Sequence, residues 1–391
     1  MISAIRDKYN NDFKESTYNN FLNDIWRWTN GEHDFRICET PLFIDEQLTS
    51  RLIEASDKIL SYLQSDDFKN KSNDAVPKEL LVQNESSHTE FLQIDFAIAS
   101  DQSGDPFPKL IELQGFASLY GFQTELDKIN RKHYSIPEGF QSYFNDLNFE
   151  SYKQMLKDTI IGNEDPENVI LLEIEPDKQK TRIDFYVTKE ILGIETVCIT
   201  KILKEKNKLF YKKNGIKKEV KKIYNRVIFD ELLKKKIEFG FDFRDELDVQ
   251  WVCHPNWFFK ISKHSLPFIQ NEFAPKCYSA EEAPIDEINL EEFVLKPLYS
   301  FAGSGVKVEL KREMLTEIND LKNYILQEKV EYMPLIKTPE GYSKAEIRMM
   351  FLWKDKPILV NNLLRTSKGK MMGVDFNKGK TWVGSNIVYH K

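Results

Sequence analysis

The segment 91–120 of this 391-residue chain constrains the fold more than any other, because it has the pattern of a β-hairpin. It reads FLQIDFAIASDQSGDPFPKLIELQGFASLY. Apolar and polar residues alternate through Leu92, Ile94 and Phe96, and the alternation resumes after a turn-forming SGDP at 103–106. Two alternating runs separated by turn residues are typical of paired antiparallel strands.

The two strands of this hairpin would carry oxygen-bearing side chains at neighbouring positions. Asp95 lies on the first strand and Glu112 on the second, and Gln114 shares the face of Glu112 because strand side chains alternate. Magnesium in proteins takes oxygen ligands and is usually held by one or two carboxylates together with substrate phosphates. The segment predicts a metal site made by Asp95, Glu112 and Gln114. The alternative is that the two carboxylates are only the solvent-facing residues of an antiparallel pair.

The segment 291–310, EEFVLKPLYSFAGSGVKVEL, has the features of a phosphate-binding loop that follows a strand. An apolar strand at 293–295 leads to Lys296, and apolar alternation restarts at 306–310 after a loop of small residues. Small residues let backbone N–H groups turn toward phosphate oxygens, and a lysine ammonium neutralises charge beside them. The candidate phosphate-binding residues are Lys296, Ser300, Gly303, Ser304 and Gly305.

No helix is expected after these glycines, which argues against a Walker-A loop and against the dinucleotide fingerprint. A β-hairpin flap that folds over a triphosphate remains as the functional interpretation. The alternative is an ordinary hairpin turn with a surface lysine. If the segments 91–120 and 291–310 meet in space, the chain is expected to bind a metal-nucleotide.

Three further strands are expected downstream. The run 324–330 would offer backbone groups to adenine, and Arg348 and Arg365 lie on the strands 345–353 and 358–365, with Glu346 on the same face as Arg348. Two guanidiniums would then approach one polyphosphate or a developing oxyanion. The alternative is cross-strand pairing of glutamate and arginine on a wet sheet face. The nucleotide-binding candidates in the first strand are Gln327, Glu328, Lys329, Val330 and Glu331.

The motifs at Lys296, 327–330, Glu346-x-Arg348 and Arg365 together resemble the nucleotide-binding strands of the ATP-grasp family. The hairpin at 91–120 resembles the magnesium hairpin of that family, in which a Glu-x-Asn triplet is usual and this chain has Glu-x-Gln. The magnesium hairpin ordinarily follows the arginine strand, whereas here it precedes every other motif. The order is therefore similar to that of the circularly permuted ATP-grasp proteins, the group similar to glutathionylspermidine synthase.

The resemblance extends upstream of the nucleotide motifs. The strand, helix and strand expected over 168–199 are similar to the small α/β domain that precedes ATP-grasp domains in this family. The strand 223–226 resembles a family strand that ends in arginine. The stretch 254–263 resembles the one that carries an earlier phosphate-binding lysine, for which Lys263 is preferred to Lys260.

The resemblance implies a mixed α+β or α/β architecture, an ATP-grasp fold in circularly permuted order with a pre-ATP-grasp domain and an N-terminal helical elaboration. A helical pattern at 45–63 supports the last of these. The expected regions are 1–84, mainly helical; 85–150, the metal-binding hairpin with connecting helices, packed against 285–391; 151–284, the pre-ATP-grasp-like α/β domain; and 285–391, the nucleotide-binding region.

The implied activity is that of a Mg-ATP-dependent ligase, which phosphorylates a carboxylate and lets an amine or a thiol attack the acyl phosphate. Such phosphoryl transfer depends on alignment and charge neutralisation. The loop 299–305 would close to exclude water. The implied roles are Mg²⁺ binding for Asp95, Glu112 and Gln114; balancing the α- and β-phosphate charge for Lys263 and Lys296; and catalytic stabilisation of the γ-phosphate and the tetrahedral intermediate for Arg348 and Arg365, with Lys296.

Composition narrows the partners and the compartment. A net charge of −7 argues against general nucleic-acid binding, although a dense lysine tract spans 201–222 around the hairpin signal Asn214-Gly215. We expect that tract to be a solvated strand edge. No apolar stretch is long enough to cross a bilayer and no signal peptide is evident, so a cytoplasmic location is expected. The four cysteines and six histidines show no metal or disulfide spacing.

Two alternatives to a ligase remain open at the level of sequence. The first is a nucleotide-binding protein of the same fold without ligase turnover, because glutamine at position 114 shifts the amide oxygen relative to asparagine. The second is a polyanion-binding or nucleic-acid-binding module built around the lysines between Lys201 and Lys222. The identities of the acid and of the amine are not indicated.

Overall fold

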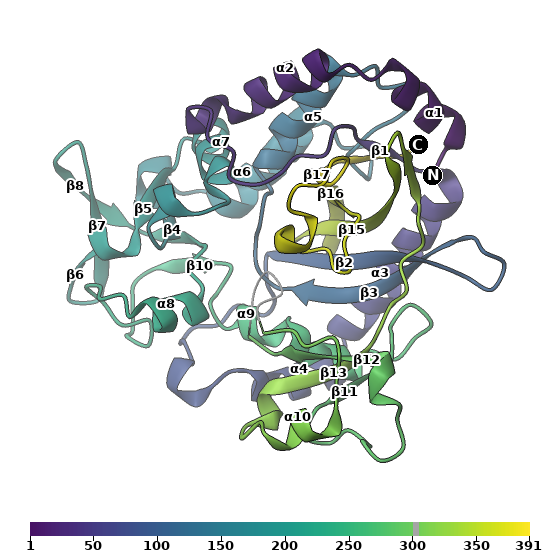
Figure 1. Cartoon of the computed structure of the whole chain (residues 1–391). Coiled ribbons are helices and arrows are strands. Elements are labelled where there is room, and N and C mark those ends of the chain that lie inside the picture. The colour runs from purple at the N-terminus through teal and green to yellow at the C-terminus, as the bar shows by residue number, and fades with distance from the viewer. Residues whose placement is uncertain (300–304) are drawn as a thin grey trace.

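A computed structural model describes residues 1–299 and 305–391 of the chain, except for the side chains of residues 374 and 375. The architecture is mixed α+β, with several sheets and with helices packed around them (Figure 1). The α-helices are α1 (Ser3–Asp12), α2 (Glu15–Ile25), α3 (Glu46–Leu63), α4 (Asp66–Ser72), α5 (Phe122–His133), α6 (Phe149–Ile160), α7 (Arg182–Leu192), α8 (Phe229–Lys235), α9 (Trp257–Lys260) and α10 (Arg312–Thr316).

The main sheet is antiparallel and joins segments that lie far apart in the sequence. Strand β2 lies between its hairpin partner β3 and strand β15, some 250 residues downstream, so the predicted hairpin at 91–120 forms and pairs with the predicted arginine strand. The strands in order are β17 (Gly384–Asn386), β16 (Pro357–Ser367), β15 (Gly341–Trp353), β2 (Phe91–Ser100) and β3 (Pro106–Gln114), with β14 (Ile336–Thr338) paired to β15.

One face of the main sheet is apolar and packs on helix α3. Ile94, Ile347 and Leu364 belong to the same core cluster as Leu48 and Leu52 of that helix. The helix forms at the predicted place because its apolar residues recur at helical spacing and its N-cap, the Asp45 side chain, accepts a hydrogen bond from the Leu48 N–H at 3.0 Å.

A second sheet is wholly parallel and lies on the other side of the molecule (Figure 1). Helix α7 connects strand β4 (Val169–Glu173) to strand β5 (Glu195–Cys198). Gly193 caps the C-terminus of this helix with a φ of +77°, a left-handed conformation that glycine adopts without strain. The expected strand, helix and strand over 168–199 therefore form. The strands in order are β10 (Gln250–Val252), β9 (Lys222–Asn225), β4 (Val169–Glu173) and β5 (Glu195–Cys198).

Two small antiparallel sheets complete the strands. One contains β6 (Leu203–Glu205), β7 (Lys208–Lys213) and β8 (Ile216–Val220), with the expected turn at Asn214-Gly215 between the last two. The other has the order β11 (Cys277–Ser279), β13 (Tyr324–Glu328) and β12 (Phe293–Pro297).

The alternation expected at 306–310 forms no strand in the described residues. It contributes one isolated bridge, in which Lys307 pairs with Leu295. Strand β11 begins before the boundary at 285 that the sequence suggests, and it pairs with β13.

The chain ends lie close together at one edge of the main sheet (Figure 1). Strand β1 (Leu42–Phe43) pairs in parallel with β18 (Val388–Tyr389), so the N-terminal helices are attached to the last residues of the chain. Between residues 1 and 84 the remaining regular structure is helical. Among the described helices, none has the length and the apolar character that a bilayer crossing requires.

Candidate functional site

Charged side chains lie side by side on the second face of the main sheet. Arg348 on β15 is directly opposite Asp95 on β2, and Asp95 is directly opposite Glu112 on β3. Glu346, two residues before Arg348, is opposite Arg365 on β16. Because directly opposed residues project to the same face, these five side chains form one stripe across four strands.

Asp95 is the centre of this stripe and is engaged by both arginines. Its two carboxylate oxygens accept from Nε and Nη2 of Arg348 at 2.6 and 2.7 Å, and Arg365 Nη2 also donates to it. Asp95 is 1% exposed. Burial alone would raise the pKa of Asp95, but the two guanidiniums outweigh it and hold the pKa below its usual value. Asp95 is therefore ionised and fully paired.

Glu346 and Arg365 form the part of the stripe that lies on strands β15 and β16. Arg365 forms ion pairs with both Asp95 and Glu346, and Tyr332 donates a hydrogen bond to the second oxygen of Glu346 at 3.0 Å. Burial, together with the nearby Asp95 charge, raises the pKa of Glu346. The Arg365 side chain remains 34% exposed and its Nε has no partner among the described residues. Arg365 therefore has one buried donor, Nε, for which the described residues provide no acceptor.

A β-bulge in β3 connects this stripe to strands β12 and β13. Asp95 pairs with Glu112 and the next residue of β2 pairs with Leu110, so Ile111 is the extra residue. Lys296 Nζ donates to the carbonyl of Ile111 at 3.3 Å and to the side-chain oxygen of Gln327, whose Nε2 donates to the carbonyl of Leu110 at 3.3 Å. The two segments singled out from the sequence therefore meet in space.

The charge of Lys296 is set by opposing influences. Burial lowers the pKa of Lys296, and the positive charge of Lys263 acts in the same direction, while Glu112 and Glu346 act against them. An anion bound beside Lys296 would act in the same direction as Glu112 and favour the charged form of the lysine.

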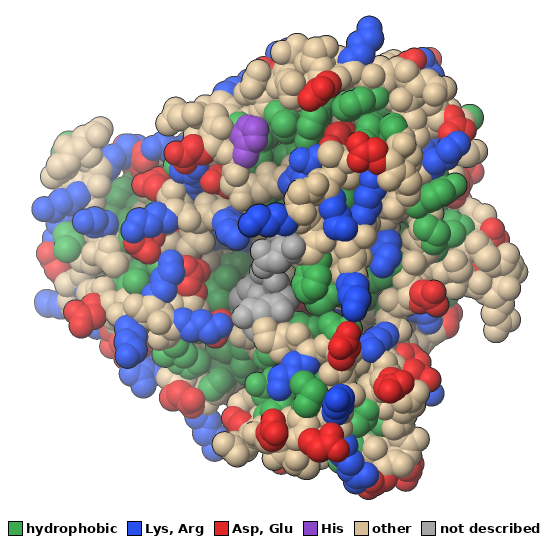
Figure 2. All heavy atoms as spheres, in the orientation of Figure 1, with side chains coloured by type: hydrophobic (Ala, Val, Ile, Leu, Met, Phe, Trp, Pro, Cys, Tyr) green, Lys and Arg blue, Asp and Glu red, His purple; other side chains and the backbone are tan. Residues whose placement is uncertain are grey.

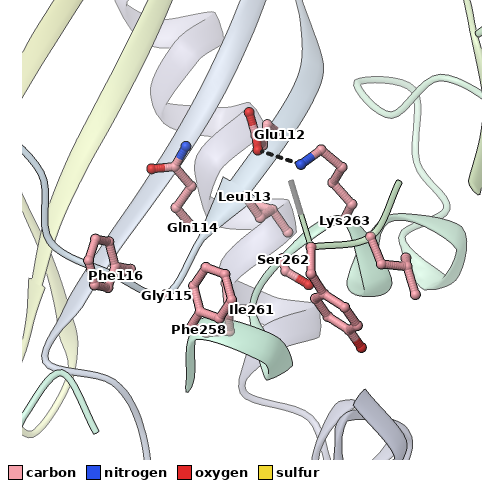
Figure 3. A pocket seen from close by; sticks show the side chains of 11 residues that line it. Glu112, Leu113, Gln114, Gly115, Phe116, Phe258, Ile261, Ser262 and Lys263 are labelled. Carbon is pink, nitrogen blue, oxygen red and sulfur yellow. Dashed lines mark ion pairs between the residues drawn. The ribbon is translucent and has the colours of Figure 1, made fainter. Parts of the chain in front are cut away.

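A small cavity lies beside the end of the hairpin (Figure 3). Glu112 and Gln114 project from the same side of β3, and Lys263 reaches Glu112 Oε1 at 3.1 Å. The cavity has a volume of about 20 Å³, which is room for roughly one water molecule. Lys260 is directed elsewhere, to Asn73 and Glu85. Of the two lysines considered from sequence, Lys263 is the one at the hairpin.

The other predicted nucleotide-binding residues lie along and after β13. Glu328 accepts a hydrogen bond from the Lys276 N–H at 3.2 Å, and Lys329 donates to the carbonyl of Glu291. Val330 is half-buried and Glu331 is exposed. Gly305 has a φ of +75°, and a Cβ there would stand 2.9 Å from the Pro297 ring. Ser300, Gly303 and Ser304, and most of the loop 299–305, lie outside the described residues.

The structure adds residues that the motif search did not select. Gln93 Oε1 accepts from Arg348 Nη1 at 2.8 Å, and Phe116 lines the cavity two residues after Gln114. Gln93 lies two residues before Asp95, so strand alternation alone would have placed it on the same face. Tyr332 directly follows the predicted nucleotide-binding run that ends at Glu331, but no pattern within that run singles it out.

The predicted metal donors are oxygen atoms of the kind that magnesium prefers. Glu112 and Gln114 line the cavity, and their side-chain oxygens fit a hard cation held together with phosphate. Asp95 differs, because both of its oxygens are bound by arginines. Within the part of the chain that the structure describes, no three His, Cys, Asp or Glu side chains form a metal-binding group.

The lysine tract between Lys201 and Lys222 carries many acidic partners. Lys208 pairs with Glu219, Lys217 with Glu205, and both Lys213 and Lys218 with Glu167. On the face shown in Figure 2, basic and acidic side chains are interspersed. The paired lysines therefore present less net charge than the sequence suggests.

Comparisons with known proteins identify the fold. No family model matches the chain, and no curated protein matches it. Among solved structures, the chain is similar to a glutathione synthetase-like effector (GSS30) from Globodera pallida in its apo form. The similarity has a TM-score of 0.58 at 10% sequence identity and covers 97% of this chain and 98% of that chain. The chain therefore has an overall fold like that of a glutathione synthetase-like protein.

Proposed function

We propose that this protein is a Mg-ATP-dependent ligase of the ATP-grasp type, with its motifs in circularly permuted order. One observation carries the proposal: the acidic hairpin β2–β3 contacts both the arginine strands and the lysine strand β12, although these are distant in sequence. The likeness to a glutathione synthetase-like fold supports it. The closeness of the chain ends makes a permuted order physically simple.

The reaction that fits these side chains is the joining of a carboxylate to an amine or a thiol through an acyl phosphate. Lys263 and Lys296 stand at the hairpin, where they would neutralise the α- and β-phosphates. Arg365 has an unpartnered Nε among the described residues and would bind the γ-phosphate and the tetrahedral intermediate. Each nitrogen of Arg348 already donates to Asp95 or Gln93, so its contribution would be to hold Asp95.

Glu112 and Gln114 are the residues that would first hold Mg²⁺, which would offset the negative charge of the phosphates. Asp95 would join them only by giving up a guanidinium. The arrival of a triphosphate provides a new partner for Arg365, so this exchange needs no unpaired buried charge. We infer a small-molecule or peptide acid as the substrate, together with an amine or a thiol. Nucleic acid is not part of the proposal.

The test is thermal stabilisation by Mg-ATP. A ligand that binds only the folded protein raises the midpoint of unfolding, and at 100 times its Kd it stabilises by about 2.7 kcal/mol. The expected result is a clear shift for the wild type and none for E112A or K296A, with the apo variants folded. K260A is the matched control, because Lys260 is a buried lysine that pairs with Glu85, away from the hairpin, and it should keep the shift. A shift unchanged in E112A and K296A would overturn the proposal.

A second function is favoured by the closed pairing of Asp95. If the two arginines never release that carboxylate, the protein binds ATP but completes no ligation. A screen of carboxylic acids with amines and thiols, monitored by ADP release, separates the two functions. ADP release that depends on both substrates supports the ligase, whereas ATP binding without substrate-dependent ADP release supports the second function.

A further inference from the structure

The segment 329–335, which connects β13 to β14, contacts the charged stripe of the main sheet. The Met333 N–H donates to the carbonyl of Ile98 on β2 at 2.9 Å, and this bond attaches the segment to the sheet. The residue before it, Tyr332, donates through its hydroxyl to Glu346 Oε2 at 3.0 Å. Tyr332 is therefore held against the stripe by its neighbour in the chain as well as by its own hydroxyl.

The hydroxyl of Tyr332 begins a chain of contacts that ends at Arg365. Glu346 accepts from Tyr332 with one oxygen and pairs with Arg365 Nη2 through the other. Burial raises the pKa of Tyr332, and the charge of Glu346 acts in the same direction, so the hydroxyl keeps its proton and remains a donor. The last torsion of a glutamate side chain is broad, so a donor on one carboxylate oxygen fixes where the other oxygen points. Tyr332 thereby determines where Arg365 is held.

The same stretch of chain also contacts the lysine of strand β12. Gln327, near the end of β13, accepts a hydrogen bond from Lys296 Nζ. The run 327–331, which the sequence predicts to bind the nucleotide, begins at this glutamine and ends directly before Tyr332. One short stretch of chain therefore touches Lys296 at its start and, at its end, the carboxylate of Glu346 that holds the arginine. A nucleotide bound along this run would lie between the two contacts.

Of the two arginines in the stripe, Arg365 is the one that a ligand can reach. Its side chain is 34% exposed, whereas that of Arg348 is 8% exposed and each of its nitrogens already donates within the protein. Hydrogen bonds between a guanidinium and a phosphate are strong because both groups are charged. The γ-phosphate is present in ATP and absent from ADP, so a contact with Arg365 would favour ATP alone.

We propose that Tyr332 is a positioning residue that makes the protein prefer ATP to ADP, because it fixes Glu346 and, through Glu346, holds Arg365 in place for the γ-phosphate. This inference rests on the proposed function and adds to it the residue that sets nucleotide specificity. Tyr332 acts through two other side chains, so its removal should weaken the contact with the γ-phosphate and leave the contacts with the rest of the nucleotide unchanged.

The experiment compares Mg-ATP with Mg-ADP, titrated calorimetrically into the wild type, Y332F, R365M and the double variant. We expect the wild type to bind ATP tenfold or more tightly than ADP, and Y332F to reduce this preference to about threefold or less, with ADP affinity within twofold of the wild type. R365M should lower the preference at least as far. The double variant should show the preference of R365M alone, because the hydroxyl acts through that arginine.

Y211F is the matched control, because Tyr211 is a buried tyrosine on β7 whose hydroxyl donates to the carbonyl of Glu167 at 2.9 Å, and it should keep both affinities. If Y332F fails to fold, E346Q carries the comparison, since it weakens the same chain at its middle and should lower the ATP preference.

Three results would overturn the inference while ATP binding itself persists. They are a wild type without a preference for ATP, a Y332F variant that keeps the full preference or loses both nucleotides alike, and a double variant in which the two losses add. Loss of both nucleotides alike is what a merely structural role would give. A wild type that binds neither nucleotide would instead refute the proposed function, and the inference with it.

Discussion

Two buried arginines of this protein, Arg348 and Arg226, differ in the hydrogen-bond partners that surround them. Arg348 donates through each of its three nitrogens, to Asp95 and to Gln93. Arg226 is buried to a similar degree, yet two of its nitrogens have no described partner. The main sheet therefore supplies an acceptor for each nitrogen of its arginine, whereas beside the parallel sheet Asp184 interacts with the charge of Arg226 and two of the Arg226 nitrogens lack a described acceptor. The difference separates an arginine whose three nitrogens all have partners within the protein from one in which two nitrogens have none among the described residues.

Removal of Asp95 should have the largest effect, because it leaves two guanidiniums without their shared carboxylate. Breaking a buried ion pair by removing one partner costs about 3–5 kcal/mol. We expect D95A to lower the free energy of unfolding by this amount in urea titrations. The double variant D95L/R348M should recover part of the loss, since it removes both charges. A D95A loss below about 1 kcal/mol would show that the stripe is not a closed network.

Substitution of Glu173 should change how stability depends on pH. The carboxyl has a pKa of about 8 in the folded protein and near 4.5 when unfolded, so between these values only the unfolded state loses its proton. Stability contributed by the protonated form is therefore present below pH 4.5 and is lost as the pH rises toward 8. The difference between these two pKa values sets an upper bound of about 5 kcal/mol on this contribution to stability, and we expect roughly half of that bound.

The matched variant for this prediction is E173Q, which keeps the acceptor for the Ile174 N–H and does not titrate. The melting temperature of E173Q minus that of the wild type should grow from pH 5 to pH 8. A difference that is flat over this range would mean that Glu173 is charged, and Arg226 would then have a counter-ion.

Replacement of Gln327 tests the contact between the bulge and strand β13. Its side chain accepts from Lys296 and donates to the carbonyl of Leu110, and an unsatisfied buried partner costs about 1–3 kcal/mol. We expect Q327A to lose about 1–2 kcal/mol in denaturant unfolding. It should also weaken Mg-ATP stabilisation, because Lys296 would no longer be held. Unchanged nucleotide binding would place Lys296 outside the site.

The smallest effect is expected at the surface. Lys217 and Glu205 form an exposed pair on the hairpin of β6 to β8, with side chains 39% and 60% exposed. Exposed pairs contribute about 0–1 kcal/mol. K217A should change the free energy of unfolding by less than about 0.5 kcal/mol. A larger loss would indicate that the lysine tract has a structural role beyond solvated edge protection.

The sequence was sufficient for local structure. Alternation and turn residues predict the hairpin within 91–120, and helical spacing over 45–63 predicts α3. It was not sufficient at 306–310, where alternating residues make only the bridge from Lys307. Strand formation there depends on a neighbouring strand, and a local sequence pattern does not show whether such a strand is available.

The chemistry of the candidate site depends on pairings that no spacing reveals. Asp95 and Arg348 are 253 residues apart, and their bidentate contact exists only because β2 and β15 are neighbours. The bulge at Ile111 that turns two carbonyls toward Lys296 and Gln327 is likewise a property of the assembled sheet. The sequence therefore predicts which residues gather in this site, and the fold determines which of their charged groups already have partners within the protein.

Calorimetric titration of ATP in the presence of Mg²⁺, into the wild type and K296M, tests the account most directly. If hairpin and lysine strand hold one triphosphate, the wild type binds with a defined stoichiometry of one, and K296M binds at least tenfold more weakly. Equal affinity in both proteins, or no heat in either, would contradict the account.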